Sequence, residues 1–153
     1  MYSILLFLHS LFRWLVLSSL IYAILRAYRG FRGRPFTRAD DSIRHWTATI
    51  AHIQLMLGCF LYFTSPLIKL FFADTKGAIA HKELSFFGII HISLMILAIV
   101  LITIGSALAK RETADADKFG TMLRWFSIAL FLIFIAIPWP FSILAGRPLF
   151  RTF

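Results

Sequence analysis

Four long apolar stretches constrain this 153-residue chain more than any other feature of its sequence. They cover about residues 2–25, 46–68, 84–108 and 122–144, and each is long enough to cross a hydrocarbon core of roughly 30 Å as a helix. Their apolar runs are continuous and lack the period-two alternation of barrel strands. A hydrophobic content of 59% and a mean hydropathy of +0.81 agree with membrane helices and exclude a disordered chain. The sequence therefore predicts an all-α integral membrane protein.

Short connections join the four predicted spans. They are about 20, 15 and 13 residues long, and links of this length place consecutive helices side by side and antiparallel. We therefore expect residues 1–153 to form a single membrane domain, folded as a four-helix up-down-up-down bundle.

Local signals mark two of the span ends. Near the second span, Asp40, Asp41 or Ser42 is expected to cap the start of the helix, because short polar side chains accept hydrogen bonds from the first backbone N–H groups. Near the end of the fourth span, Pro138 and Pro140 are expected to kink or end the helix, because proline lacks the N–H that a helix needs.

The basic residues divide unequally between the two ends of the predicted bundle. Ten of the sixteen lie in or beside the first and third connections, and five lie at the opposite end. Loops rich in Lys and Arg stay in the cytoplasm, so we expect both termini outside. The net charge of +9 then reflects topology and contact with anionic lipid headgroups, not nucleic-acid binding. The ten are Arg26, Arg29, Arg32, Arg34, Arg38, Arg44, Lys110, Arg111, Lys118 and Arg124, and the five are Lys69, Lys76, Lys82, Arg147 and Arg151.

Polar side chains inside the predicted spans are few, and they mark candidate functional sites because placing them in lipid costs free energy. The first span contains His9 and Arg13, the second contains His52 and Gln54, and the third contains His91. No Asp or Glu lies within a span, so a carboxylate proton relay is not expected. Arg13 needs an anion or several carbonyl groups, and a haem propionate, a quinone oxygen or backbone carbonyls would each serve.

Depth along the helices relates the histidines to one another. At 1.5 Å of rise per residue, His9 lies about 7–8 Å and His91 about 10 Å below the outer surface. Their helices are the first and third, which are diagonal in a simple bundle, so both imidazoles can point into the shared centre. Two imidazoles facing each other across an apolar slot suit the axial positions of six-coordinate haem b. We therefore predict His9 and His91 as metal ligands, with histidines that merely pack and hydrogen-bond as the alternative.

His52 lies about 9 Å from the cytoplasmic surface, well below the other two histidines. It needs a different partner, and the alternatives are a second haem, a quinone headgroup and a backbone carbonyl. The predicted cofactor-binding residues are thus His9, Arg13, His52 and His91. Phosphate-binding loops, paired zinc ligands and hydrolase triads are absent from the sequence, which leaves open whether the chain catalyses a reaction.

Residues 8–17, 49–58, 61–66, 91–110 and 136–141 carry a pattern that extends over nearly the whole chain. The pattern resembles a family of short four-helix bacterial membrane proteins commonly labelled "cytochrome B". The resemblance implies a bacterial inner-membrane protein, and it implies that the four predicted cofactor-binding residues are motif positions. The family often has an acidic residue just before the histidine of the third span, whereas this chain has Ile90.

We therefore expect a haem b-binding electron-transfer protein that exchanges electrons with the quinone pool or with a partner protein. One alternative is a cofactor-free accessory subunit of a larger membrane complex, which the many aromatic residues and the lack of a soluble domain favour. Another is a quinone- or porphyrin-handling protein that uses His52 and Arg13 without permanent haem. The expected partners are the lipid bilayer, a quinone and a respiratory or other membrane complex.

Overall fold

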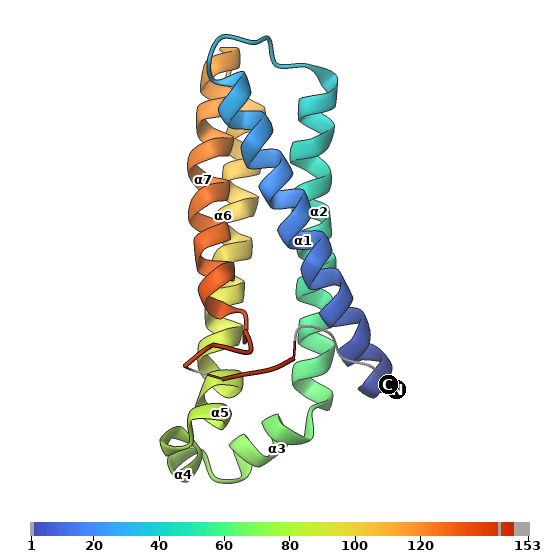
Figure 1. Ribbon diagram of the computed structural model, residues 1–153, viewed down its shortest axis with the longest axis vertical. Coiled ribbons are helices and arrows are strands. Elements are labelled where there is room, and N and C mark those ends of the chain that lie inside the picture. Colours follow the sequence, from blue (N-terminus) through green and yellow to red (C-terminus); the bar gives the residue numbers. More distant parts are fainter. Residues whose placement is uncertain (1, 144, 149–153) are drawn as a thin grey trace.

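The computed structural model describes residues 2–143 and 145–148, and all regular structure in this part of the chain is helical (Figure 1). Four helices are long and apolar enough to cross a membrane. They are α1 (Tyr2–Gly30), α2 (Arg38–Thr64), a third helix over Lys82–Arg111 whose main part is α6 (His91–Arg111), and α7 (Asp115–Ala136). The predicted all-α class and the four apolar helices are thereby confirmed.

The four long helices pack around a common centre. α1 contacts α2 and α7, and α6 also contacts α2 and α7, so α1 and α6 lie diagonally across the bundle. Figure 1 shows residues 31–37 crossing the upper end and the short helices at the lower end. The fully buried core side chains of the four long helices include Leu20, Ala27, Ile102, Phe119 and Phe126.

Glycines allow the helices to approach closely at two crossings. A Cβ on Gly30 of α1 would lie 2.4 Å from Cζ of Phe119 in α7, and a Cβ on Gly105 of α6 would lie 2.3 Å from Cβ of Trp125 in α7. Small residues are common at such crossings in membranes, where van der Waals packing between helices replaces the hydrophobic effect. These contacts hold α7 against both α1 and α6.

The start of α2 corrects the predicted helix cap. Thr37 is the N-cap: its side chain accepts from the backbone N–H of Asp40 at 3.4 Å, and the Asp40 carboxylate accepts from the backbone N–H of Thr37 at 3.0 Å. The expectation that Asp40, Asp41 or Ser42 caps this helix is therefore wrong. The error arises because the first turns of α2 are polar and carry no apolar periodicity, so the helix begins earlier than its hydrophobic pattern.

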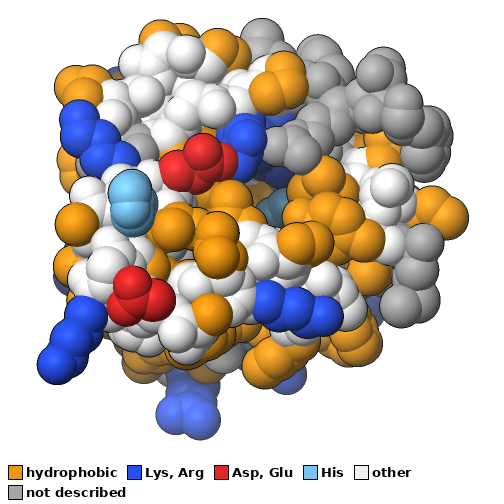
Figure 2. Space-filling model, turned by 90° about the horizontal axis from the view of Figure 1, so that it is seen from below, with side chains coloured by type: hydrophobic (Ala, Val, Ile, Leu, Met, Phe, Trp, Pro, Cys, Tyr) orange, Lys and Arg blue, Asp and Glu red, His pale blue; other side chains and the backbone are white. Residues whose placement is uncertain are grey.

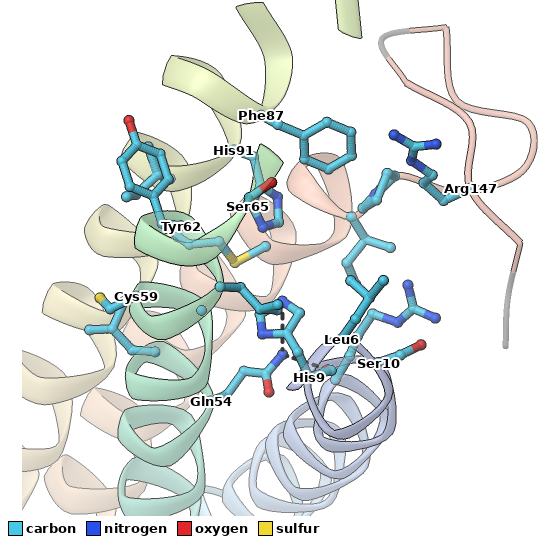
Figure 3. Close-up of a pocket in the computed structure, with 18 of the residues that line it drawn as sticks. Leu6, His9, Ser10, Gln54, Cys59, Tyr62, Ser65, Phe87, His91 and Arg147 are labelled. Carbon is cyan, nitrogen blue, oxygen red and sulfur yellow. Dashed lines mark hydrogen bonds between the residues drawn. The ribbon is translucent and has the colours of Figure 1, made fainter. Parts of the chain in front are cut away.

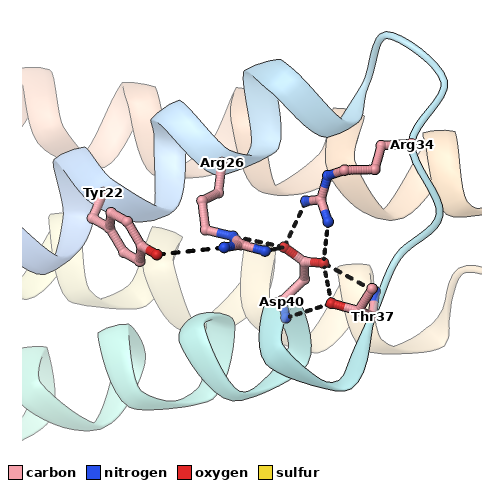
Figure 4. A network of polar contacts seen from close by, with 5 residues as sticks. All are labelled: Tyr22, Arg26, Arg34, Thr37 and Asp40. Atoms are coloured by element: carbon pink, nitrogen blue, oxygen red, sulfur yellow. Dashed lines mark hydrogen bonds and ion pairs between the residues drawn. The ribbon is translucent and has the colours of Figure 1, made fainter.

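Asp40 also joins α1 to α2 (Figure 4). Its side chain is 1% exposed and accepts from Arg26 Nε at 2.9 Å and from both terminal nitrogens of Arg34 at 2.8 and 3.0 Å. A buried carboxylate is tolerated only when it is paired and hydrogen-bonded, as it is here. Two of the ten arginines and lysines that mark this end of the bundle thus hold the connection between the first two helices.

The ends of the second and fourth predicted spans also differ from the structure. α2 ends at Thr64, and residues 66–68 belong to the separate α3 (Pro66–Ala73), because Pro66 cannot continue the preceding helix and instead starts the next. α7 ends at Ala136, just before Pro138, although the span was expected to reach residue 144. Leu144 and Arg151 lie outside the described residues.

Short elements close the lower end of the bundle in Figure 1. They are α3, α4 (Thr75–Ala80), α5 (Lys82–Ser85) and the π-helix η1 (Phe86–Ile90), which runs directly into α6. After α7 the chain continues as an irregular segment that runs across the lower part of the bundle toward α2. We call its described residues, 137–143 and 145–148, the C-terminal strap.

Candidate functional site

A cavity of about 260 Å³ lies between the long helices at the end closed by the short elements. This volume is close to the lower limit of roughly 300 Å³ for small-molecule pockets. Figure 2, which views the molecule from that end, shows a hollow among hydrophobic side chains. Most of the lining is aliphatic or aromatic, and none of the described lining residues is Asp or Glu. The cationic and imidazole side chains that line it are His9, Arg13, His91 and Arg147.

The cavity brings together His9 from α1 and His91 from α6 (Figure 3). Their ring centroids are 6.4 Å apart and the ring planes meet at 70°. The two helices are diagonal, so the rings meet across the centre of the bundle and not along one helix face. The two imidazole rings therefore lie next to each other at the centre of the bundle.

A backbone carbonyl orients His91. Nδ1 of His91 lies 2.8 Å from the carbonyl oxygen of Ala136, at the last residue of α7. A carbonyl only accepts, so Nδ1 carries the proton and donates it, which leaves Nε2 with a free lone pair. Metal-binding histidines are commonly oriented in this way by a carbonyl on their other nitrogen.

Gln54 of α2 fixes the segment that carries His9. Its Nε2 donates to the backbone carbonyl of His9 at 3.0 Å and lies 3.4 Å from Nε2 of the His9 ring. Within the described part of the chain, Nδ1 of His9 and Oε1 of Gln54 are buried and make no hydrogen bond. A buried polar atom without a partner costs about 1–3 kcal/mol, and such atoms in a cavity indicate where a ligand or water binds.

Two features of the backbone lie next to the histidine pair. A Cβ on Gly58 of α2 would lie 3.3 Å from Cε1 of His9, so the glycine gives the ring its space. The π-helix η1 ends directly before His91, and Tyr62 donates to the carbonyl of Gly88 within it at 2.8 Å. Single π-helical turns are frequent at functional sites because they change the direction of the side chains that follow.

Arg13 lines the same cavity as His9, as expected from its position four residues later on α1. Its guanidinium carbon lies 5.4 Å from the centroid of the Trp14 ring. The cavity therefore contains a fixed positive charge near the imidazole pair, in apolar surroundings where charges interact strongly.

His52 does not join this site. It is exposed on the outer surface of α2, where its Nδ1 donates to the carbonyl of Ala48 at 2.7 Å and its Nε2 lies 3.2 Å from the hydroxyl of Thr103 on α6. Of the alternatives considered for this histidine, the backbone carbonyl is the partner that it has. The predicted set of four residues thus divides into three that share the cavity and one that lies outside it.

From the sequence, Gln54 was predicted to be an intramembrane polar residue without a defined role, and Arg147 was predicted to be one of the outer charges. The signal for Gln54 was its spacing of four residues from Gly58, which places both on one face of α2. No pattern indicated that the C-terminal strap would carry Arg147 back to the cavity.

Among the described residues, no group of three or more His, Cys, Asp and Glu side chains could hold a metal ion. A metal bound between His9 and His91 would therefore take most of its ligands from a cofactor. Comparisons with protein-family models, curated proteins and solved structures find no match to this chain. The geometry of the cavity is thus the basis on which function is inferred.

Proposed function

We propose that the protein binds haem b and transfers electrons in the bacterial inner membrane. The observation that carries this proposal is the approach of His9 and His91 to 6.4 Å across an apolar cavity. Two imidazoles from diagonal helices would suit a metal-containing cofactor, and four-helix bundles hold cofactors between facing side chains in this way.

Some residues around the cavity would bind the iron, and others would position the residues that bind it. His9 and His91 would hold the iron, and the Ala136 carbonyl keeps Nε2 of His91 available for it. Gln54 and Gly58 set the position of His9. When bound, haem supplies one-electron redox chemistry, and two protein ligands leave no coordination position for a substrate, which favours electron transfer.

Arg13 provides positive charge inside the same cavity. A guanidinium in an apolar site favours an anionic or strongly polar neighbour, and a haem propionate or a quinone oxygen has this character. The electrons would come from or go to the quinone pool or a partner protein, because the described part of the chain is one helical bundle without a second domain for a soluble substrate.

The distribution of basic residues also indicates how the bundle is oriented in the membrane. We infer that the four long helices alternate in direction across the bilayer, with the arginine-rich connection of residues 31–37 in the cytoplasm and both termini outside. The cavity then lies in the outer half of the membrane, and electron exchange at the histidine pair takes place near the outer surface.

Absorption spectroscopy of the full chain tests the ligand assignment. The wild-type protein, purified in detergent after expression with ample haem, is expected to show the paired visible bands of a reduced low-spin haem b. His9→Ala and His91→Ala should each remove these bands or convert them to a five-coordinate spectrum. His52→Ala is the matched control, because His52 is an intramembrane histidine outside the cavity, and its spectrum should equal that of wild type.

Two results would contradict the proposal. A wild-type protein that stays colourless, even after haem is added to the purified chain, favours the cofactor-free accessory subunit or the quinone- and porphyrin-handling protein. Loss of the bands in His52→Ala but not in His9→Ala would mean that the haem lies elsewhere.

A further inference from the structure

The C-terminal strap brings a second arginine to the cavity. Arg147 lines it together with Phe87, and its guanidinium carbon lies 5.2 Å from the centroid of the Phe87 ring (Figure 3). The side chain is 30% exposed, which places it at the opening of the cavity. Its backbone N–H donates to the carbonyl of Pro138 at 3.2 Å, so the strap closes on itself just before this residue.

Arg147 forms an ion pair with Glu83 of α5. The Glu83 side chain is 51% exposed and is not among the residues that line the cavity. An ion pair this exposed contributes little to stability, because water and salt screen both charges. A different carboxylate can therefore replace Glu83 at small cost in free energy.

The charge of the cavity favours such a carboxylate. Arg13 and Arg147 both line it, the described lining contains no Asp or Glu, and the remaining surface is largely apolar. A ligand that suits this lining has an apolar body and a carboxylate at its outer end. Arg recognises a carboxylate through two parallel hydrogen bonds, which are strong where water is partly excluded.

We propose that Arg147 binds a carboxylate of the amphiphilic ligand held in the cavity, and that Glu83 occupies Arg147 when the ligand is absent. The inference rests on the proposed function, because haem b is an amphiphile with two propionate carboxylates. The Arg147 side chain is 30% exposed, so it can meet a carboxylate at the edge of the cavity. Fatty acids share this chemistry, so the test separates the two sources.

The test compares haem with its dimethyl ester, which lacks both free carboxylates. Dissociation constants are measured for the full chain in detergent micelles. Wild type should bind the free acid roughly ten- to hundredfold more tightly than the ester, the range expected for a charge-assisted hydrogen bond. Arg147→Leu should bring this ratio close to one, and Arg147→Lys should keep part of it.

Glu83→Gln decides between ligand binding and a purely structural ion pair. If Glu83 competes with the ligand, Glu83→Gln should bind the free acid several-fold more tightly than wild type, opposite to Arg147→Leu. If the ion pair only holds the strap in place, both variants should weaken binding of acid and ester alike, which would overturn the proposal. Lys76→Gln is the control, because Lys76 lies on α4 and does not line the cavity.

The same measurements with iron-free protoporphyrin IX and its dimethyl ester separate this inference from the proposed function. His9→Ala should change the haem spectrum and leave the ratio of acid to ester affinity intact. One outcome is that wild type binds neither haem nor porphyrin and still binds oleate more tightly than methyl oleate, with the difference lost in Arg147→Leu. In that case the haem proposal fails and the carboxylate site stands. An unchanged acid-to-ester ratio in Arg147→Leu would overturn the carboxylate site while the ligation by His9 and His91 stands.

Discussion

Gln54 is one of the residues that hold His9 in position. Its amide donates to the backbone carbonyl of His9 at 3.0 Å and lies beside the ring. We expect Gln54→Leu to weaken haem binding by roughly 10–100-fold, the usual effect of removing a residue that orients a metal ligand. Titration of the purified chain with haem measures this change.

Thr49→Leu is the matched control for this substitution. Thr49 is another polar residue of α2, and its hydroxyl donates within its own helix to the carbonyl of His45 at 3.0 Å. Its replacement should leave haem affinity unchanged. Equal affinities for wild type and Gln54→Leu would show that the position of His9 does not depend on the amide.

Some residues of the cavity could be predicted from the sequence, and others could not. The spacing of His9 and Arg13, together with the depth of His91, predicted side chains that share the centre of a bundle, and the structure brings all three to one cavity. Arg147 could not be predicted in the same way, because its place depends on the path of an irregular segment. No periodicity determines such a path.

Asp40 links α1, the connection of residues 31–37 and α2, so its loss should affect the stability of the bundle. Its buried carboxylate holds Arg26 of α1 and Arg34 of the connection at 2.8–3.0 Å. Asp40→Asn keeps the shape of the side chain and removes the charge, so it should lower the free energy of unfolding by about 2–3 kcal/mol, as expected for hydrogen bonds to charged groups. Thermal or denaturant unfolding in detergent micelles measures the loss.

Asp115→Asn is the control for Asp40→Asn, because Asp115 forms an exposed ion pair. Asp115 on α7 pairs with Lys118 at 3.5 Å and its side chain is 45% exposed. Asp115→Asn should cost less than about 1 kcal/mol, because exposed ion pairs contribute little. If the two variants lose equal stability, the network around Asp40 does not hold α1 and α2 together.

The helices themselves were predictable, but their ends were not. Hydrophobic content alone located four long helices, because an apolar run of this length has few other stable structures in lipid. It placed the start of α2 too late, since Thr37 precedes a polar stretch, and it carried the helix past Thr64, since the residues after Pro66 are equally apolar. The π-helix before His91 also escaped prediction, because Phe86–Ile90 is apolar throughout and carries no signal for an extra residue in the turn.

Packing differs between the two ends of the molecule as a whole. Toward the connection of residues 31–37, small residues bring the helices close, and Phe119 is fully buried against Gly30. Toward the short elements the long helices leave the cavity, which they line together with α3 and the C-terminal strap. The close helix crossings and the candidate site therefore lie toward opposite ends of the bundle.

The orientation of the whole molecule determines which side of the membrane the cavity faces. Ten basic residues mark the end that carries residues 31–37 and five mark the other, so the first end should remain in the cytoplasm. A phosphatase reporter fused after Phe153 should be active, because this enzyme folds only outside the cytoplasm. A fluorescent reporter inserted at Thr113, in the connection between α6 and α7, should be bright. The opposite pair of results would place the cavity in the cytoplasmic half and would require an electron donor or acceptor on that side, while the approach of His9 to His91 would remain the same.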